Sequence, residues 1–248
     1  MPTAAPIKKG GGIDEILKGQ TPGKLDVEKE PAVARREEFE TLLLKYELAL
    51  ELDISPREKY LREMKKTVGV LTPEEIDLFL QTTVRYENHE KYCSSTGYFI
   101  SRLIQDSYDA GHNDFTLNTK GLRGLDKLCT ELKGKKKNPL KVTINGNAGN
   151  CCGEDSKRSL FYIEGNAGDD CGRVSKKSVF CVSGDVGSKC GSWSKKSTFK
   201  TPNRETLGKM YKDIDDSKYG GRVVFIKPDG TEEEVLNFTK LEYYIDIT

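Results

Sequence analysis

The chain has 248 residues, of which 35% are hydrophobic and 32% are charged, and its formal net charge is +1. No apolar run approaches the about 18 residues that span a bilayer, and no apolar segment follows Lys8 and Lys9, so we expect neither a membrane partner nor secretion. Seven cysteines are an odd number in a chain too large to need disulfides, which favours reduced thiols in a cytoplasmic protein.

The first half of the chain is predicted to be a flexible tail followed by a helical domain. Residues 1–31 are rich in glycine and proline and lack apolar periodicity, so we assign them to the tail. Residues 32–112 carry apolar side chains at helical spacing and form the helical domain. Within it, Ser55-Pro56 is typical of a helix start, the segment 72–75 is a capping box with a proline, and a further helix is expected over 96–110.

The next segment leads into an internal repeat. Phe115 to Leu117 is predicted to be a brief strand. A helix is predicted over 121–132 because four residues fall at helical spacing, namely Leu122, Leu125, Cys129 and Leu132.

Three units of 19 residues then follow one another, beginning at Ile144, Ile163 and Val182. A period this short cannot hold a strand–helix–strand unit, which takes about 30 residues. It fits one coil of a β-solenoid, in which equivalent residues stack about 4.8 Å apart. We therefore expect an interior column of phenylalanines and a set of corner glycines, namely Phe161, Phe180, Phe199, Gly146, Gly165 and Gly184.

The start of each unit carries a glycine motif. The sequence Gly-Asn-Ala-Gly occurs at 146–149 and 165–168, and Gly-Asp-Val-Gly occurs at 184–187. With its spacing and the apolar run before it, this motif resembles the GXGXG repeat domain, which is found in glutamate synthase and in formylmethanofuran dehydrogenase. The resemblance covers residues 144–200 and implies a right-handed β-helix that organises catalytic domains without catalytic residues of its own.

The C-terminal part completes the predicted fold. A helix is expected over 205–214, and a β-hairpin over 222–227 and 234–238. The helices at 121–132 and 205–214 would cover the two ends of the repeats. The predicted class is thus α+β, a helical N-terminal domain followed by a short right-handed single-stranded β-helix of three coils, with a C-terminal helix and β-hairpin. The predicted domains are 1–31, 32–112, 113–201 and 202–248.

Cysteines recur at one position of the repeat, as Cys152, Cys171 and Cys190. Clustered thiolates could hold zinc or an iron–sulfur cluster. No C-x-x-C pair is present, however, and a buried cysteine also serves as a small hydrophobic residue. Both interpretations stay open; core packing is favoured, and no cofactor is predicted apart from a metal at this column.

Positive pairs recur at another position, and the segment 118–200 as a whole is basic between acidic flanks. Stacked like charges repel unless solvent or an anion screens them, so the pairs are candidates for binding an anionic ligand, nucleic acid included. Alternatively, they form a solvated edge that discourages sheet pairing, or the acidic flanks fold back over them. Aromatic side chains for base stacking are limited to Trp193 and to phenylalanines that we expect to be internal. The pairs are Lys157-Arg158, Lys176-Lys177 and Lys195-Lys196.

No catalytic residue is predicted, because neither His89 nor His112 belongs to a known catalytic or metal-binding pattern, and we favour a protein that is not an enzyme. The leading hypothesis is a non-catalytic scaffold that binds a protein partner or itself. In view of the resemblance, that scaffold would be an accessory component of an oxidoreductase complex. The alternatives are a binder of an anionic ligand or nucleic acid through the lysine pairs, and a metal or redox protein built on the cysteines.

Overall fold

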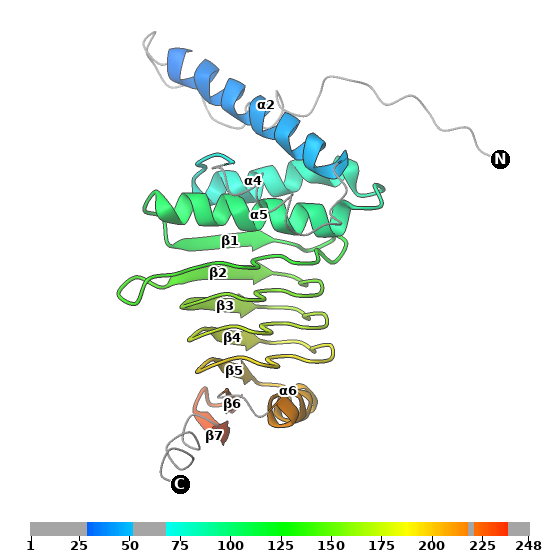
Figure 1. Cartoon of the computed structure of the whole chain (residues 1–248), viewed down its shortest axis with the longest axis vertical. Helices are drawn as coiled ribbons and strands as arrows, with labels where there is room; N and C mark the ends of the chain where they lie inside the picture. The colour runs from blue at the N-terminus through cyan, green and yellow to red at the C-terminus, as the bar shows by residue number, and fades with distance from the viewer. Residues whose placement is uncertain (1–28, 52–67, 218–220, 238–248) are drawn as a thin grey trace, which may run out of the picture. The chain divides into compact units, whose positions relative to one another are not determined.

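The computed structural model describes residues 29–51, 68–217 and 221–237 (Figure 1). The chain divides into two compact units, residues 1–41 and residues 42–248. In the described part the helices are α2 (Lys29–Glu51), α4 (Pro73–Thr82), the 3-10 helix η1 (Thr83–Tyr86), α5 (Tyr92–Asp109) and α6 (Arg204–Ser217). The strands are β1 (Asp114–Asn118), β2 (Leu140–Asn145), β3 (Ser159–Ile163), β4 (Val179–Val182), β5 (Thr198–Thr201), β6 (Arg222–Ile226) and β7 (Glu232–Asn237).

The seven strands form one sheet in the order of the sequence. Every pairing from β1 to β6 is parallel, and β7 runs antiparallel to β6. Within the repeats the register is offset by one 19-residue unit, so that Phe161 pairs with Phe180 and Phe180 with Phe199. Side chains alternate along a strand, which leaves one face of β2 and β3 buried and the other more exposed.

The predicted fold class is wrong. The described residues form an α/β arrangement, an open and mostly parallel mixed sheet of seven strands with four α-helices, rather than a helical domain followed by a three-coil β-helix. The sheet extends beyond the repeats at both edges because β1 pairs with β2 and β6 pairs with β5. The predicted hairpin exists, but its strands β6 and β7 belong to this same sheet.

The segment 121–132 is a series of turns, so the helix predicted there is wrong as well. Lys127 and Cys129 both have φ of 62°, a left-handed conformation that a right-handed helix excludes. Backbone groups of this segment bind the first repeat: the Lys127 amide donates to the Asn150 carbonyl at 2.6 Å, and the Glu131 amide donates to the Glu154 carbonyl at 2.8 Å. Residues 113–139 therefore make a degenerate repeat in front of the three that the sequence shows.

Helices cover both edges of the repeats. On one side α4 packs on β1, where the Asp77 carboxylate accepts from the backbone amide of Asn118 at 2.7 Å and from its Nδ2 at 2.8 Å, with α5 beside α4 (Figure 1). On the other side the Asp213 carboxylate of α6 accepts from the Cys190 amide at 2.9 Å. The prediction that the helix at 205–214 covers one end is confirmed, whereas α4 and α5, not residues 121–132, cover the other.

The local helix signals agree with the structure in part. The capping box is confirmed, because Thr72 Oγ1 accepts from the Glu75 amide and Glu75 Oε2 accepts from the Thr72 amide. The helix predicted over 96–110 begins earlier, at Tyr92. The helix start at Ser55-Pro56 and most of the predicted tail lie outside the described residues.

Candidate anion-binding edge

The lysine pairs of the repeats lie at the corner that precedes each strand. Parallel bridges join Lys157, Lys176 and Lys195 into one row, and Lys133 of the degenerate repeat adds a fourth member. Backbone hydrogen bonds hold the row, as when the Lys176 amide donates to the Ser156 carbonyl at 2.8 Å. The sequence does not reveal Lys133 as a member, because it does not follow the 19-residue spacing.

The second residue of each pair turns the corner. Arg158, Lys177 and Lys196 have positive φ values of 52°, 55° and 55°, and all three side chains are exposed. Buried serines flank the pairs on both sides, so the corner presents its cations to solvent and its small hydroxyls to the interior. These serines are Ser156, Ser175 and Ser194 before the pairs and Ser159, Ser178 and Ser197 after them.

An inserted loop carries three more lysines, of which Lys135 and Lys136 lie near Arg158 and Lys177. The Lys135 amide donates to the Tyr108 hydroxyl of α5 at 2.7 Å, and this hydroxyl donates to the Asn138 carbonyl at 2.5 Å. Gly134 permits the close packing, since a Cβ there would lie 2.1 Å from the carbonyl oxygen of Arg158. We call the combined surface the basic edge; it comprises Lys133, Lys135, Lys136, Lys137, Lys157, Arg158, Lys176, Lys177, Lys195 and Lys196.

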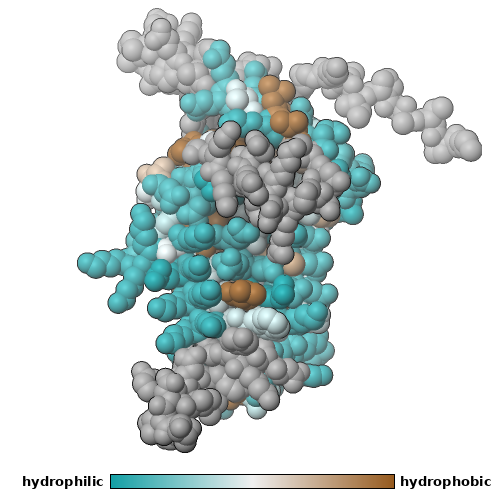
Figure 2. All heavy atoms as spheres, viewed as in Figure 1, coloured by the Kyte–Doolittle hydropathy of each residue, from teal (hydrophilic) through white to brown (hydrophobic). Residues whose placement is uncertain are grey.

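A hollow of about 260 Å³ lies where the inserted loop meets the repeats. Four cationic and two apolar residues line it, namely Lys135, Lys136, Arg158, Lys177, Pro139 and Leu160. Hydrophilic side chains gather along the side on which β2 to β5 begin, at the left of Figure 2. Two like charges one strand spacing apart repel by about 0.9 kcal/mol even in water, so a bound anion would relieve repulsion along this edge.

The cysteine column is internal. The side chains of Cys152, Cys171 and Cys190 are fully buried, and the thiols of neighbouring members are hydrogen-bonded to one another. Cys129 of the degenerate repeat is buried near them. All seven cysteines carry free thiols, and no cluster of three or more metal-binding side chains occurs in the described residues.

Burial and hydrogen bonds between the thiols together set the pKa values of these cysteines. Desolvation raises the pKa of Cys129, and the hydrogen bond to Cys171 together with burial raises the pKa of Cys152. Burial, followed by the nearby carboxylate of Glu154, also raises the pKa of Cys151 to about 11. Because zinc and iron–sulfur clusters bind thiolates, the raised pKa values of Cys129, Cys152 and Cys190 in a fully buried interior fit the core-packing interpretation better than the metal one.

The predicted phenylalanine column is confirmed. The ring centroids of Phe161 and Phe180 lie 4.6 Å apart, those of Phe180 and Phe199 lie 5.0 Å apart, and both pairs are stacked. The corner glycines also adjoin one another, because a Cβ on Gly165 would lie 2.6 Å from the carbonyl oxygen of Gly146 and one on Gly184 would lie 2.7 Å from that of Gly165. These contacts join each repeat to the next in register.

Two rows of polar side chains tie each repeat to the next. Asn147 Oδ1 accepts from the Asn166 amide at 2.9 Å, and Asn166 Oδ1 accepts from the Asp185 amide at 2.8 Å. A second row does the same through Asp126, Asn150, Asp169 and Ser188. The repeats are therefore fixed by side chains as well as by strand pairing.

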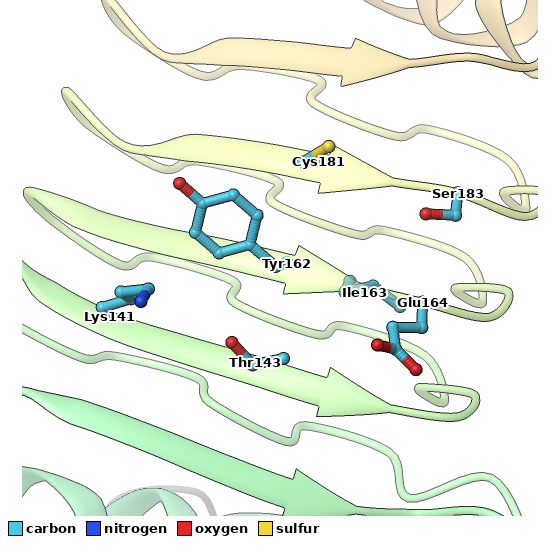
Figure 3. A pocket seen from close by; sticks show the side chains of 7 residues that line it. All are labelled: Lys141, Thr143, Tyr162, Ile163, Glu164, Cys181 and Ser183. Atoms are coloured by element: carbon cyan, nitrogen blue, oxygen red, sulfur yellow. The ribbon is translucent and has the colours of Figure 1, made fainter. Parts of the chain in front are cut away.

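A second hollow, of about 450 Å³, lies on the exposed face of β2, β3 and β4 (Figure 3). Lys141 lies on one side of it, with its Nζ 5.9 Å from the ring centroid of Tyr162 and 2.8 Å from Asp114 Oδ2. Glu164 and Ser183 lie on the other side (Figure 3). Because Asp114 pairs with the one cation in this hollow and Glu164 adds a negative charge, the hollow is a weaker anion site than the basic edge.

No family model, curated protein or solved structure matches this chain. The resemblance to the GXGXG repeat domain therefore stays a prediction. Among the described helices, none combines the length and the apolar composition needed to cross a membrane.

Proposed function

We propose that this chain is a non-catalytic binding module that holds a polyanionic ligand along its basic edge. The observation that supports the proposal is the row itself, in which four successive repeats place a lysine at the same corner. The inserted loop adds Lys135 and Lys136, which line a hollow together with Arg158 and Lys177. A ligand with regularly spaced negative charges would neutralise these cations and release counterions, which is a large source of affinity for polyanions.

The fixed backbone of the row also supports the proposal. The corner amides are bonded from one repeat to the next, as between Lys177 and the Lys195 carbonyl at 2.9 Å. Because the backbone is already ordered, binding would cost mainly the side-chain freedom of lysine and arginine. An edge arranged in this way suits a long ligand better than a single small anion.

Retention on immobilised heparin at increasing salt tests the proposal. The full-length chain is expected to be retained at low salt, and the double variant Lys176→Glu with Lys195→Glu is expected to elute at much lower salt. The reason is that two neighbouring members of the row change from attraction to repulsion.

The matched control is the double variant Lys120→Glu with Lys189→Glu. Both lysines are exposed and lie outside the basic edge, and the change in net charge is the same. This variant is expected to elute like the unmodified chain. An equal loss of retention in both double variants would mean that net charge alone causes binding, and the proposal would fail.

The scaffold hypothesis and the metal hypothesis can each be tested by a separate experiment. A scaffold that binds an acidic protein would use the same edge, and co-purification from the native host would identify such a partner, including an oxidoreductase. Metal analysis of protein prepared without chelators tests the cysteine hypothesis. The free thiols support a cytoplasmic location as part of the proposal.

A further inference from the structure

We infer that the polyanion is a single-stranded nucleic acid whose bases stack on Trp193, beside the end of the basic edge that the third repeat forms. This inference rests on the proposed function and deepens it, because it names the class of ligand. Trp193 is the single tryptophan of the chain, and 55% of its surface is exposed. An exposed aromatic residue next to a line of cations is the combination with which proteins bind single strands without reading their sequence.

The backbone places Trp193 beside the row. Trp193 precedes Lys195 by two residues, and Ser194 between them is only 1% exposed. Trp193 and Lys195 are both exposed on either side of this buried serine, so both side chains face solvent within two residues of each other. The sequence shows Trp193 as an aromatic residue within the basic segment, but the repeat pattern alone does not establish that its side chain is exposed.

The residues that are equivalent to Trp193 in the other repeats indicate at which end of the basic edge the bases would stack. Glu131, Asp155, Val174 and Trp193 occupy equivalent left-handed positions of the four repeats, with φ values of 58°, 51°, 58° and 64°. Neighbouring members are joined through the backbone, as when the Val174 amide donates to the Ser192 carbonyl at 3.0 Å. The first two members are acidic and repel phosphates, whereas Val174 and Trp193 form an uncharged end on which a base can pack.

The length of the row fits a short stretch of one strand. Three strand spacings of about 4.8 Å separate Lys133 from Lys195, or about 14 Å in total. Stacked nucleotides rise by about 3.4 Å each, so the row matches about four phosphates. A duplex would keep its base faces inside the stack and out of reach of Trp193, which favours a single strand over a double one.

The test compares ligands of equal charge with and without bases. Fluorescence of Trp193 and anisotropy of a labelled strand would be measured with an oligothymidylate of about 12 nucleotides, an abasic strand of the same length, and inorganic polyphosphate. The oligothymidylate is expected to quench Trp193 and to bind more tightly than the abasic strand. Polyphosphate is expected to compete for the edge while leaving the fluorescence of Trp193 nearly unchanged.

Variants of Trp193 make the result specific. Trp193→Ala is expected to weaken oligothymidylate binding by about 5- to 150-fold and to leave polyphosphate binding unchanged, whereas Trp193→Phe keeps most of the affinity. Tyr162→Ala, which removes an aromatic side chain that is 41% exposed on the sheet face, is the matched control and is expected to have no effect.

Two outcomes separate the inference from the proposed function. If the abasic strand and the oligothymidylate bind equally well and Trp193 is not quenched, the inference is wrong but the anion-binding proposal stands. If neither strand nor polyphosphate binds at low salt, both are wrong. The affinities of the wild-type chain for the oligothymidylate, the abasic strand and polyphosphate distinguish these outcomes even if Trp193→Ala fails to fold.

Discussion

Gly172 illustrates how closely single residues are fitted in the repeats. Its φ is +65°, and a Cβ at this position would lie 2.7 Å from Cε1 of Phe199 and 2.9 Å from Cε2 of Phe180. Gly172→Ala would therefore add left-handed backbone strain to a steric clash with two stacked rings. We expect a loss of about 2–4 kcal/mol in the free energy of unfolding, measured by urea denaturation.

The matched control for this prediction is Gly230→Ala. Gly230 also has positive φ, +80°, but a Cβ there would meet no atom within 4 Å. The variant Gly230→Ala therefore adds left-handed backbone strain without a steric clash, and we expect a loss of only about 1–2 kcal/mol in the free energy of unfolding. If Gly230→Ala destabilises the protein as much as Gly172→Ala, the clash with the phenylalanine column is not the cause.

The partly buried thiol of Cys151 predicts a dependence of stability on alkaline pH. Burial raises the pKa of Cys151 from its ordinary value of 9.0 to about 11, so the folded chain holds this proton more tightly than the unfolded chain does. The resulting stability is complete below pH 9 and is lost as the pH rises towards 11. The loss should be well below the about 2.7 kcal/mol of two full pKa units, because Cys151 is partly exposed and solvent screens it.

Urea denaturation of the wild-type chain and of Cys151→Ala, at several pH values between 8 and about 11, checks this prediction. The free energy of unfolding should fall less steeply with pH in the variant, because one titrating group is absent. Identical pH profiles for the two proteins would contradict the assigned pKa.

Among the elements, α6 allows a test of how the last repeat is covered. The Asp213 carboxylate accepts from the Cys190 amide at 2.9 Å, whereas Asp215 two residues later is exposed. Asp213→Ala leaves that amide without its charged acceptor, and we expect a loss of about 1.5–3 kcal/mol in stability. Asp215→Ala should change stability by less than about 0.5 kcal/mol. Hydrogen exchange at the Cys190 amide should accelerate in the first variant and not in the second.

The elements also show which parts of the fold can be predicted from sequence. The capping box at Thr72 was predictable because it depends on residues three apart in the chain. The segment 121–132 was not, because its apolar spacing fits a helix while its backbone groups bind the next repeat. The degenerate repeat was hidden for a related reason: the loop that contains Lys135 breaks the 19-residue spacing.

The predicted fold class was wrong because of strands that lie outside the repeats. The period correctly predicts which residues pair from β3 to β5, but it carries no information on whether β1 and β6 continue the sheet. Among the candidate site residues, the lysine pairs were recognisable because they recur. Lys133 and the exposure of Trp193 depend on the folded chain and could not be read from the pattern.

The whole molecule should tolerate the loss of one complete repeat. Deleting residues 163–181 joins Tyr162 to Val182, which keeps every row in register and places Phe161 next to Phe199. We expect this variant to unfold cooperatively at a lower urea concentration, because one set of nearest-neighbour contacts is missing. Lys176 and Lys177 are also lost with this repeat. The slope of the logarithm of the oligonucleotide binding constant against the logarithm of salt concentration should therefore become shallower by about 1.4.

The control for the deletion is a variant that lacks one residue fewer, 163–180. Its strand register would shift by one position, which turns buried side chains outward, so we expect no cooperative unfolding. Circular dichroism and urea denaturation distinguish the two. Equal stability of both deletions would mean that the repeats are not held by their rows.

The repeats are covered at their two edges by different helices, and this has a consequence for how the protein can evolve. Because the strand that α4 packs on is β1, and α6 packs on β5 and β6 at the other edge, the units in between can change in number while both covers keep these contacts. An in-frame duplication of one unit in the gene would lengthen the basic edge by one step. Evolution could thus adjust the length of polyanion that the protein binds by changing the number of repeats alone. No substitution in the covering helices would be needed.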